Sequence, residues 1–238
     1  SATMNAIKGY ALYEYDNERD KAFEFFQKAL EINPNVGEVN FLPGACFLYL
    51  GLYEQALMFL ERASALDPYY LWTPYKIAVC YMNMGEFEKA ARHFEEYFEL
   101  APVTLIFPGR YIALMVQMNN LERVEELIRD IERSHPDYGL LPYCKSLLHA
   151  ARGEKEQALA LYRNSEVLAM LDMKDEAIAA LKSEIRGTSE IPYIFYRDLL
   201  INPFYESLRV DKRFNEILEE ERTLYDEYSA KYRHFNSL

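Results

Sequence analysis

Glycine and proline are scarce in this chain, with 9 and 10 residues among 238, which disfavours a loop-rich all-β fold. Basic residues are outnumbered, because 26 Lys and Arg stand against 38 Asp and Glu and give a formal net charge of −12. A surface of that charge repels phosphate, so nucleic acids and anionic membranes are poor partners. No apolar run approaches the ~20 residues of a membrane span. Half of the residues are hydrophobic, which is enough for a substantial core.

Motifs for catalysis and for metal binding are also missing from the sequence. Neither a Gly-rich phosphate loop nor an HExxH or GxSxG motif occurs, and no two histidines stand three or four residues apart. The three cysteines are far apart and form no CxxC pair, so they predict neither a disulfide framework nor a zinc site. They are Cys46, Cys80 and Cys144. We therefore expect a protein without cofactor, metal or enzymatic activity. Unpaired thiols favour a cytoplasmic location, and the chain can be a fragment of a larger protein.

A 34-residue repeat dominates what is present. Prolines recur at that spacing, and so do an apolar column, a column of small residues, a column of large residues and a column of glycine or asparagine. The columns are Pro34, Pro68, Pro102 and Pro136; Tyr13, Phe47, Tyr81 and Met115; Ala22, Ala56, Ala90, Val124 and Ala158; Phe26, Leu60, Phe94, Ile128 and Tyr162; and Asn17, Gly51, Gly85, Asn119 and Gly153. Five columns in one register indicate repeated structural units.

Each unit reads as two antiparallel helices joined by a tight turn. Apolar residues within a unit recur three and four apart, which is helical periodicity. The glycine or asparagine falls between two such stretches, where a left-handed residue ends a helix. A small residue early in the second helix lets the two helices approach closely. The recurring proline then ends the second helix.

This pattern resembles the tetratricopeptide repeat, in which a first helix carrying L-G-x2-Y is followed by A-x3-F and a final proline. One unit matches the family at Gly44, Phe47, Gly51, Tyr53, Ala56, Ala63 and Pro68, and the neighbouring units match in the same register. The resemblance implies an all-α, right-handed superhelical α-solenoid of antiparallel helix pairs. We expect five to six repeats within residues 1–187, approximately 3–36, 37–70, 71–104, 105–138, 139–163 and 164–187. Capping helices are expected in residues 188–238.

The 34-residue period breaks after the fifth unit. Ala158 is followed only 19 residues later by the similar site at Ala177, so about 15 residues are missing from one unit. Either a truncated helix pair is present or one helix runs from about 155 to 171, and the sequence favours the long helix. A final helix is expected over about 211–233, with its apolar stripe covering the open flank of the last hairpin.

The resemblance also implies where a partner binds. In this family the first helix of each pair lines a concave groove, and here its positions are apolar and aromatic. Five side chains at groove positions lie outside the core columns: Tyr15, Phe41, Tyr49, Trp72 and Tyr75. Some members hold a C-terminal carboxylate with lysine and asparagine, which are absent from those positions here. Lys8, Lys76 and Arg110 share one position, either as a weak basic edge or as plain surface charges. The predicted partner is a protein or peptide with an apolar or aromatic segment.

Two functions are compatible with these features. The first is a non-catalytic protein–protein interaction scaffold that binds a peptide or protein surface in the groove. The second is a C-terminal regulatory or sensory module of a larger bacterial signalling protein. Residues 202–214 resemble the segment that closes tetratricopeptide arrays attached to nucleotide cyclases, protein kinases or winged-helix regulators. The sequence upstream in the parent gene would separate the two.

Overall fold

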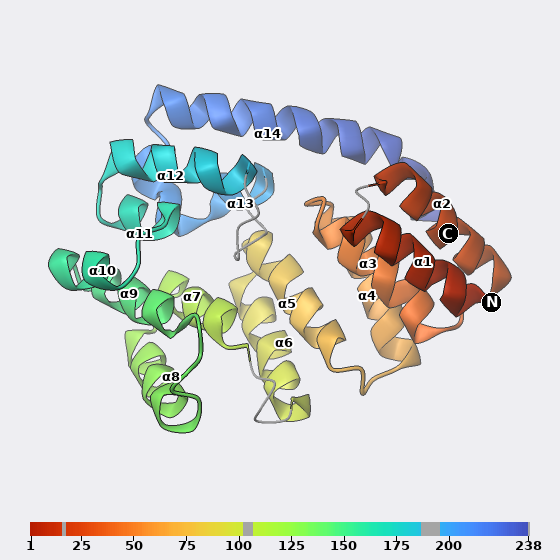
Figure 1. The fold of residues 1–238 in the computed structure, drawn as a ribbon, viewed down its shortest axis with the longest axis horizontal. Coiled ribbons are helices and arrows are strands. Elements are labelled where there is room, and N and C mark those ends of the chain that lie inside the picture. Colours follow the sequence, from red (N-terminus) through yellow and green to blue (C-terminus); the bar gives the residue numbers. More distant parts are fainter. Residues whose placement is uncertain (16–17, 102–106, 187–195, 238) are drawn as a thin grey trace. The chain divides into compact units, whose positions relative to one another are not determined.

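The computed structural model describes residues 1–15, 18–101, 107–186 and 196–237, and within these ranges it contains helices and no strand (Figure 1). The predicted all-α fold of helix pairs is confirmed. The chain forms two compact units, one of Ser1–Thr104 with Thr223–Leu238 and the other of Leu105–Arg222. The predicted domain boundary near residue 187 lies outside the described residues and stays a prediction.

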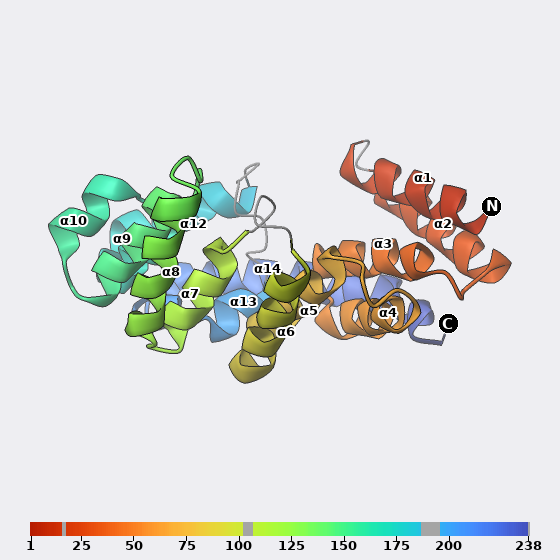
Figure 2. The ribbon, with the colours of Figure 1, turned by 90° about the horizontal axis from the view of Figure 1, so that it is seen from below.

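The first unit contains three antiparallel helix pairs, visible in Figure 2. They are α1 (Ala2–Glu14) with α2 (Arg19–Ile32), α3 (Gly37–Leu48) with α4 (Tyr53–Leu66), and α5 (Trp72–Asn83) with α6 (Phe87–Leu100). The first helices of successive pairs contact one another, α1 with α3 and α3 with α5. The unit is completed by the end of α14 (Lys212–Lys231) and by the 3-10 helix η3 (Arg233–Ser237).

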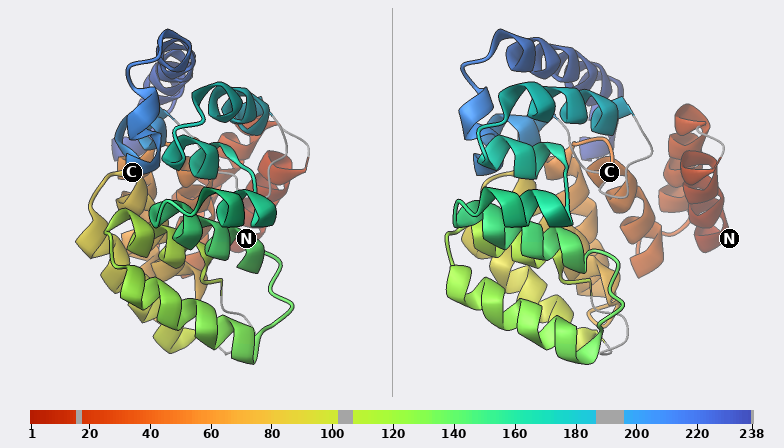
Figure 3. Two further views of the ribbon diagram at one scale, coloured as in Figure 1. Left: turned by 90° about the vertical axis from the view of Figure 1, so that its left-hand side faces the viewer. Right: turned by 60° about the vertical axis from the view of Figure 1, so that its left-hand side comes forward.

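The second unit continues the helix pairs and then becomes irregular (Figure 3). It contains α7 (Gly109–Gln117) with α8 (Leu121–Ser134), α9 (Leu141–Ala151) with α10 (Lys155–Leu161), and α11 (Ser165–Met170) with α12 (Lys174–Arg186). The short helix α13 (Tyr196–Ile201), the 3-10 helix η2 (Pro203–Leu208) and the start of α14 follow. The final helix is thus found within two residues of its predicted bounds.

The turns inside the pairs have the backbone conformation that the sequence predicts. Gly51, Gly85 and Gly153 have φ of 73°, 78° and 74°, and Asn119 has φ of 57°. Asn17, the remaining member of that column, lies outside the described residues. Asp172, with φ of 56°, makes the same turn between α11 and α12 and was not predicted. Asp172 lies only 19 residues after Gly153, so it does not fall on the 34-residue spacing of that column.

The column of small residues explains how closely the helices of each pair approach. All five members, from Ala22 to Ala158, are fully buried. Three members of the neighbouring column of large residues, Phe26, Leu60 and Phe94, are also fully buried. Tyr162 is only half-buried, because α10 ends at Leu161 and Tyr162 takes an extended conformation.

The long helix favoured for residues 155–171 is wrong. Residues 162–164 separate α10 from α11, and the Asn164 side chain caps α11 by accepting a hydrogen bond from the amide of Val167 at 3.0 Å. The missing residues are therefore divided between two pairs, which shortens the second helix of one and the first helix of the next.

Residues 199–217 pack on the last helix pair of the second unit. Phe214 and Ile217 at the start of α14 are buried in one cluster with Ala177, Ile178 and Leu181 of α12. Leu199 and Tyr205, from α13 and η2, complete the cluster. The flank of α12 is thus closed by apolar side chains from residues 199–217.

Candidate protein-binding site

Helix α1 exposes an apolar row on one side and buries small residues on the other. Met4, Ile7 and Tyr15 follow one another at helical spacing and are 64%, 44% and 84% exposed. The opposite side approaches α2 so closely that a Cβ added at Gly9 would lie 2.8 Å from the carbonyl oxygen of Ala22. Close packing on one side therefore turns a continuous apolar row outward on the other.

Tyr49 joins side chains of the first helices of three successive pairs. Its ring stacks on Tyr13 of α1 with centroids 6.2 Å apart, and its hydroxyl accepts a 2.8 Å hydrogen bond from the Nζ of Lys76 of α5. The same ammonium group lies 4.7 Å from the centroid of the Tyr49 ring, in cation–π range. Lys76 is only 9% exposed, so the interpretation as a plain surface charge is wrong for this residue.

Trp72 and Tyr75 form an aromatic group at the start of α5. The Trp72 ring stacks on Tyr97 of α6 with centroids 6.0 Å apart. Tyr75 makes edge contacts with Tyr97 at 5.2 Å and with Phe94 at 5.7 Å. Both remain half-buried, so each ring keeps part of its surface accessible. Contacts with α6 therefore hold the accessible rings in fixed orientations.

Phe41 differs from the other four predicted residues. It is 6% exposed, and its ring lies edge-on against Tyr70 of the linker between α4 and α5, with centroids 4.7 Å apart. Phe41 therefore lies outside the core columns and is nevertheless buried by packing. Tyr70 covers it and is itself 37% exposed, so it presents the aromatic surface at this point.

We call the surface of Met4, Ile7, Tyr15, Tyr49, Trp72 and Tyr75 the α1–α3–α5 face. Tyr70 was missed as a member of its surroundings, whereas Lys76 was named from the sequence as a basic edge or a surface charge. The repeat position that Lys76 shares with Lys8 pointed to it, but its burial depends on Tyr49, which comes from another element. Tyr70 lies in a linker and carries no repeat signal.

The cysteines behave as buried apolar residues. All three are buried and free of disulfides. Burial raises the pKa of the Cys144 thiol to about 12, and it raises the pKa of the Cys46 and Cys80 thiols as well. Because the thiolate is the reactive form, these pKa values disfavour nucleophilic or redox chemistry at all three residues.

A cluster of buried polar groups lies in the second unit. Tyr143 donates a 2.6 Å hydrogen bond to Glu166, and the hydroxyl of Ser165 donates to Glu184 at 2.5 Å. Asp198 accepts a hydrogen bond from the side chain of Asn202 at 3.4 Å. Burial, followed by the negative charge of Glu166, raises the pKa of Asp198 to about 7. The first two hydrogen bonds join α9, α11 and α12, so they help to hold the irregular end of the unit together.

Neither a metal-binding cluster nor a membrane-spanning helix occurs in the part of the chain that the structure describes. No group of three or more His, Cys, Asp or Glu side chains there is arranged to hold a metal ion. None of the helices in the described ranges has both the length and the apolar character that crossing a membrane requires.

Comparison with known proteins agrees with the helix pairs. Residues 3–36 and 47–106 each match a family model described as tetratricopeptide repeat. The first match has the same bounds as the first predicted repeat. No curated protein is similar enough to the chain to count as a match. Proteins of this kind typically mediate protein–protein interactions and are typically non-catalytic. Residues 3–36 and 47–106 are thus similar to tetratricopeptide repeats, and almost all of the matched residues lie in the first unit.

Proposed function

We propose that the chain is a non-catalytic interaction scaffold whose α1–α3–α5 face binds an apolar or aromatic segment of a partner protein. The observation that carries the proposal is the exposed apolar row of Met4, Ile7 and Tyr15 along α1 and at its C-terminal end, at positions that the resemblance assigns to the groove. Removing such a row from water favours association.

The remainder of the face suits recognition of such a segment. Tyr49 and Trp72 are held by ring stacking, so binding immobilises few additional rotamers. The side chain of Lys76 is engaged by Tyr49, so the face presents aromatic surface with a polar hydroxyl. An extended peptide or the apolar side of an amphipathic helix matches this combination.

A display selection of random peptides on the full chain tests the proposal. The dissociation constants of the selected peptides are measured by fluorescence anisotropy. We expect apolar and aromatic peptides to be enriched. The double change Ile7→Ala and Tyr15→Ala should weaken binding by at least ~30-fold if both residues are hot spots. Trp72 is the only tryptophan, so its emission should change on binding.

The matched control removes two exposed apolar side chains elsewhere in the first unit. Ile32 at the end of α2 and Leu66 at the end of α4 are 58% and 39% exposed. Ile32→Ala with Leu66→Ala should leave the affinity unchanged. Selected peptides that lose affinity with the control pair and not with the α1 pair would show that this face is not the binding site.

A second proposal is that the chain is a regulatory module of a larger bacterial signalling protein. It rests on the resemblance of residues 202–214, which here form η2 and the start of α14 and pack on α11 and α12. Sequencing the parent gene tests it, because a cyclase, kinase or winged-helix domain is expected upstream. The buried thiols support the expected cytoplasmic location, which fractionation of the source cells would check.

A further inference from the structure

The C-terminal residues of the chain insert an aromatic side chain between three helices of the first unit. Phe235 of η3 is 1% exposed. Its ring centroid lies 5.5 Å from those of Phe23 of α2 and Phe47 of α3, and 6.3 Å from that of Phe59 of α4. A side chain of η3 therefore fills an aromatic cage built by the first two repeats. We call the surface of Phe23, Phe47 and Phe59, which belong to α2, α3 and α4, the α2–α4 face.

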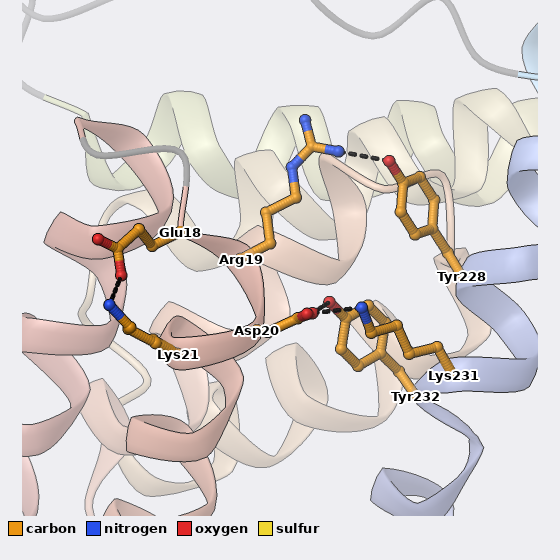
Figure 4. A pocket seen from close by; sticks show the side chains of 7 residues that line it. All are labelled: Glu18, Arg19, Asp20, Lys21, Tyr228, Lys231 and Tyr232. Atoms are coloured by element: carbon orange, nitrogen blue, oxygen red, sulfur yellow. Dashed lines mark hydrogen bonds and ion pairs between the residues drawn. The ribbon is translucent and has the colours of Figure 1, made fainter.

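Tyr232 adds a second anchor with a polar end. Its ring stacks on Phe23 with centroids 4.1 Å apart, and its hydroxyl donates a 3.2 Å hydrogen bond to Asp20. The same carboxylate forms a 2.5 Å ion pair with Lys231 (Figure 4). Arg19 donates a hydrogen bond to the hydroxyl of Tyr228, one turn earlier in α14.

The edge of this contact is open to water and charged. A cleft of about 460 Å³ lies beside it, lined by residues 18–21 of α2 and its N-terminal end and by Tyr228, Lys231 and Tyr232. The side chains of Asp20 and Lys231 are 66% and 50% exposed, and ion pairs between such exposed groups add little affinity. The buried rings therefore supply affinity, whereas the Asp20–Lys231 pair supplies orientation.

The geometry is that of a helical ligand in a groove. Tyr228 of α14 precedes the two anchors Tyr232 and Phe235 by four and seven positions, a spacing also found when an amphipathic helix enters an apolar groove, and Phe235 lies in η3 beyond the end of α14. The anchors follow the helix pairs of the first unit by more than 120 positions along the chain. Side-chain contacts, and not closeness in sequence, therefore hold the C-terminal residues to the first unit.

We propose that the α2–α4 face is a docking site for helix ends that carry two aromatic anchors preceded by a basic residue. The C-terminal residues of the chain are its resident ligand, and a partner segment of the same chemistry binds by displacing them. This site shares no residue with the α1–α3–α5 face, and different variants test the two proposals.

A labelled peptide of residues 223–238 is the direct probe. In the wild-type chain the tethered segment has an effective concentration that reaches the millimolar range for well-matched tethers, so the peptide should bind weakly. Tyr232→Ala with Phe235→Ala in the full chain should vacate the face and tighten peptide binding at least ~10-fold. The peptide carrying the same two changes should not bind either protein. A folded double variant that fails to bind the native peptide would overturn the proposal.

Charge reversal keeps the test decisive if the double variant does not fold. Asp20 is exposed, so Asp20→Lys should fold and should bind the Lys231→Glu peptide more tightly than the native peptide. Glu31→Lys on the same helix is the matched control and should not reverse this preference. Equal affinities for the two peptides would contradict the assigned contact. A wild-type dimer that forms at high concentration and is lost in the double variant would assign the face to a second copy of the chain instead.

Discussion

At the scale of single residues, the buried carboxyl group of Asp198 makes the stability of the fold depend on pH. Its pKa is raised from 3.8 to about 7 by burial and by Glu166, although the nearby Arg110 favours the charged form. Tyr205 from η2 and Asn202 complete its surroundings. The folded state therefore retains a proton that the unfolded chain releases near pH 4.

The sign of the effect follows from linkage. A group with a raised pKa stabilises the fold fully below its unfolded pKa, and that stability is lost as the pH rises towards about 7. The shift from 3.8 to about 7 corresponds to at most roughly 4 kcal/mol. We expect Asp198→Asn to raise the free energy of unfolding at pH 8 and to leave it nearly unchanged at pH 4.

Urea unfolding of both proteins at the two pH values measures this difference. Asp137→Asn, at an exposed position of the same unit, is the control and should not alter the pH dependence. If Asp198→Asn is equally neutral at both pH values, then Asp198 is ionised in the folded protein and the proposed burial effect is wrong.

At the scale of elements, the turns inside the pairs depend on backbone conformation and not on side-chain contacts. Gly153 has φ of 74°, and a Cβ added there would meet no atom within 4 Å. Gly139, before α9, has the same open surroundings without a positive φ. The two positions thus separate the effect of backbone conformation from the effect of space.

We expect Gly153→Ala to destabilise the protein by about 1–2 kcal/mol, the cost of a left-handed conformation for a residue with a Cβ. Gly139→Ala should be neutral or should stabilise by up to about 1 kcal/mol, because alanine restricts the unfolded chain. Thermal unfolding of the two variants checks the contrast. Equal changes in Tm would mean that the turn at Gly153 tolerates an ordinary conformation.

At the scale of the whole molecule, the C-terminal residues contribute to two cores in turn. Phe214 and Ile217 are buried in the second unit, whereas Tyr232 and Phe235 are buried in the first. Shortening the chain in two steps should therefore weaken the units one after the other.

A chain ending at Arg222 should lose amide protection around Phe23, Phe47 and Phe59 and keep it in α11 and α12. A chain ending at Arg186 should lose protection in both units and expose apolar surface. Hydrogen exchange followed by mass spectrometry resolves the two regions. Uniform loss of protection in the longer truncate would show that the units unfold as one.

The sequence alone determined the repeat, the helix pairs and the residues that make them. The 34-residue period locates the turn between the two helices of each pair, because few residue types tolerate a left-handed conformation. It also locates the close helix crossing, because only a small side chain such as Ala90 fits there. The same register singled out Tyr15, whose side chain is exposed. These features depend on neighbours in sequence or on the same position one repeat away, so one chain is enough to read them.

The tertiary structure decided the contacts between residues that no period relates. Tyr70 covers Phe41, Lys76 is buried against Tyr49, and Phe235 enters the cage around Phe23. The tertiary structure also decided the break between α10 and α11. Local periodicity allowed one continuous helix there, but Tyr162 is extended and half-buried and Asn164 caps the start of α11. Each outcome depends on which apolar surfaces remain uncovered once the pairs have stacked, and burial of such surface is non-directional and carries no fixed spacing.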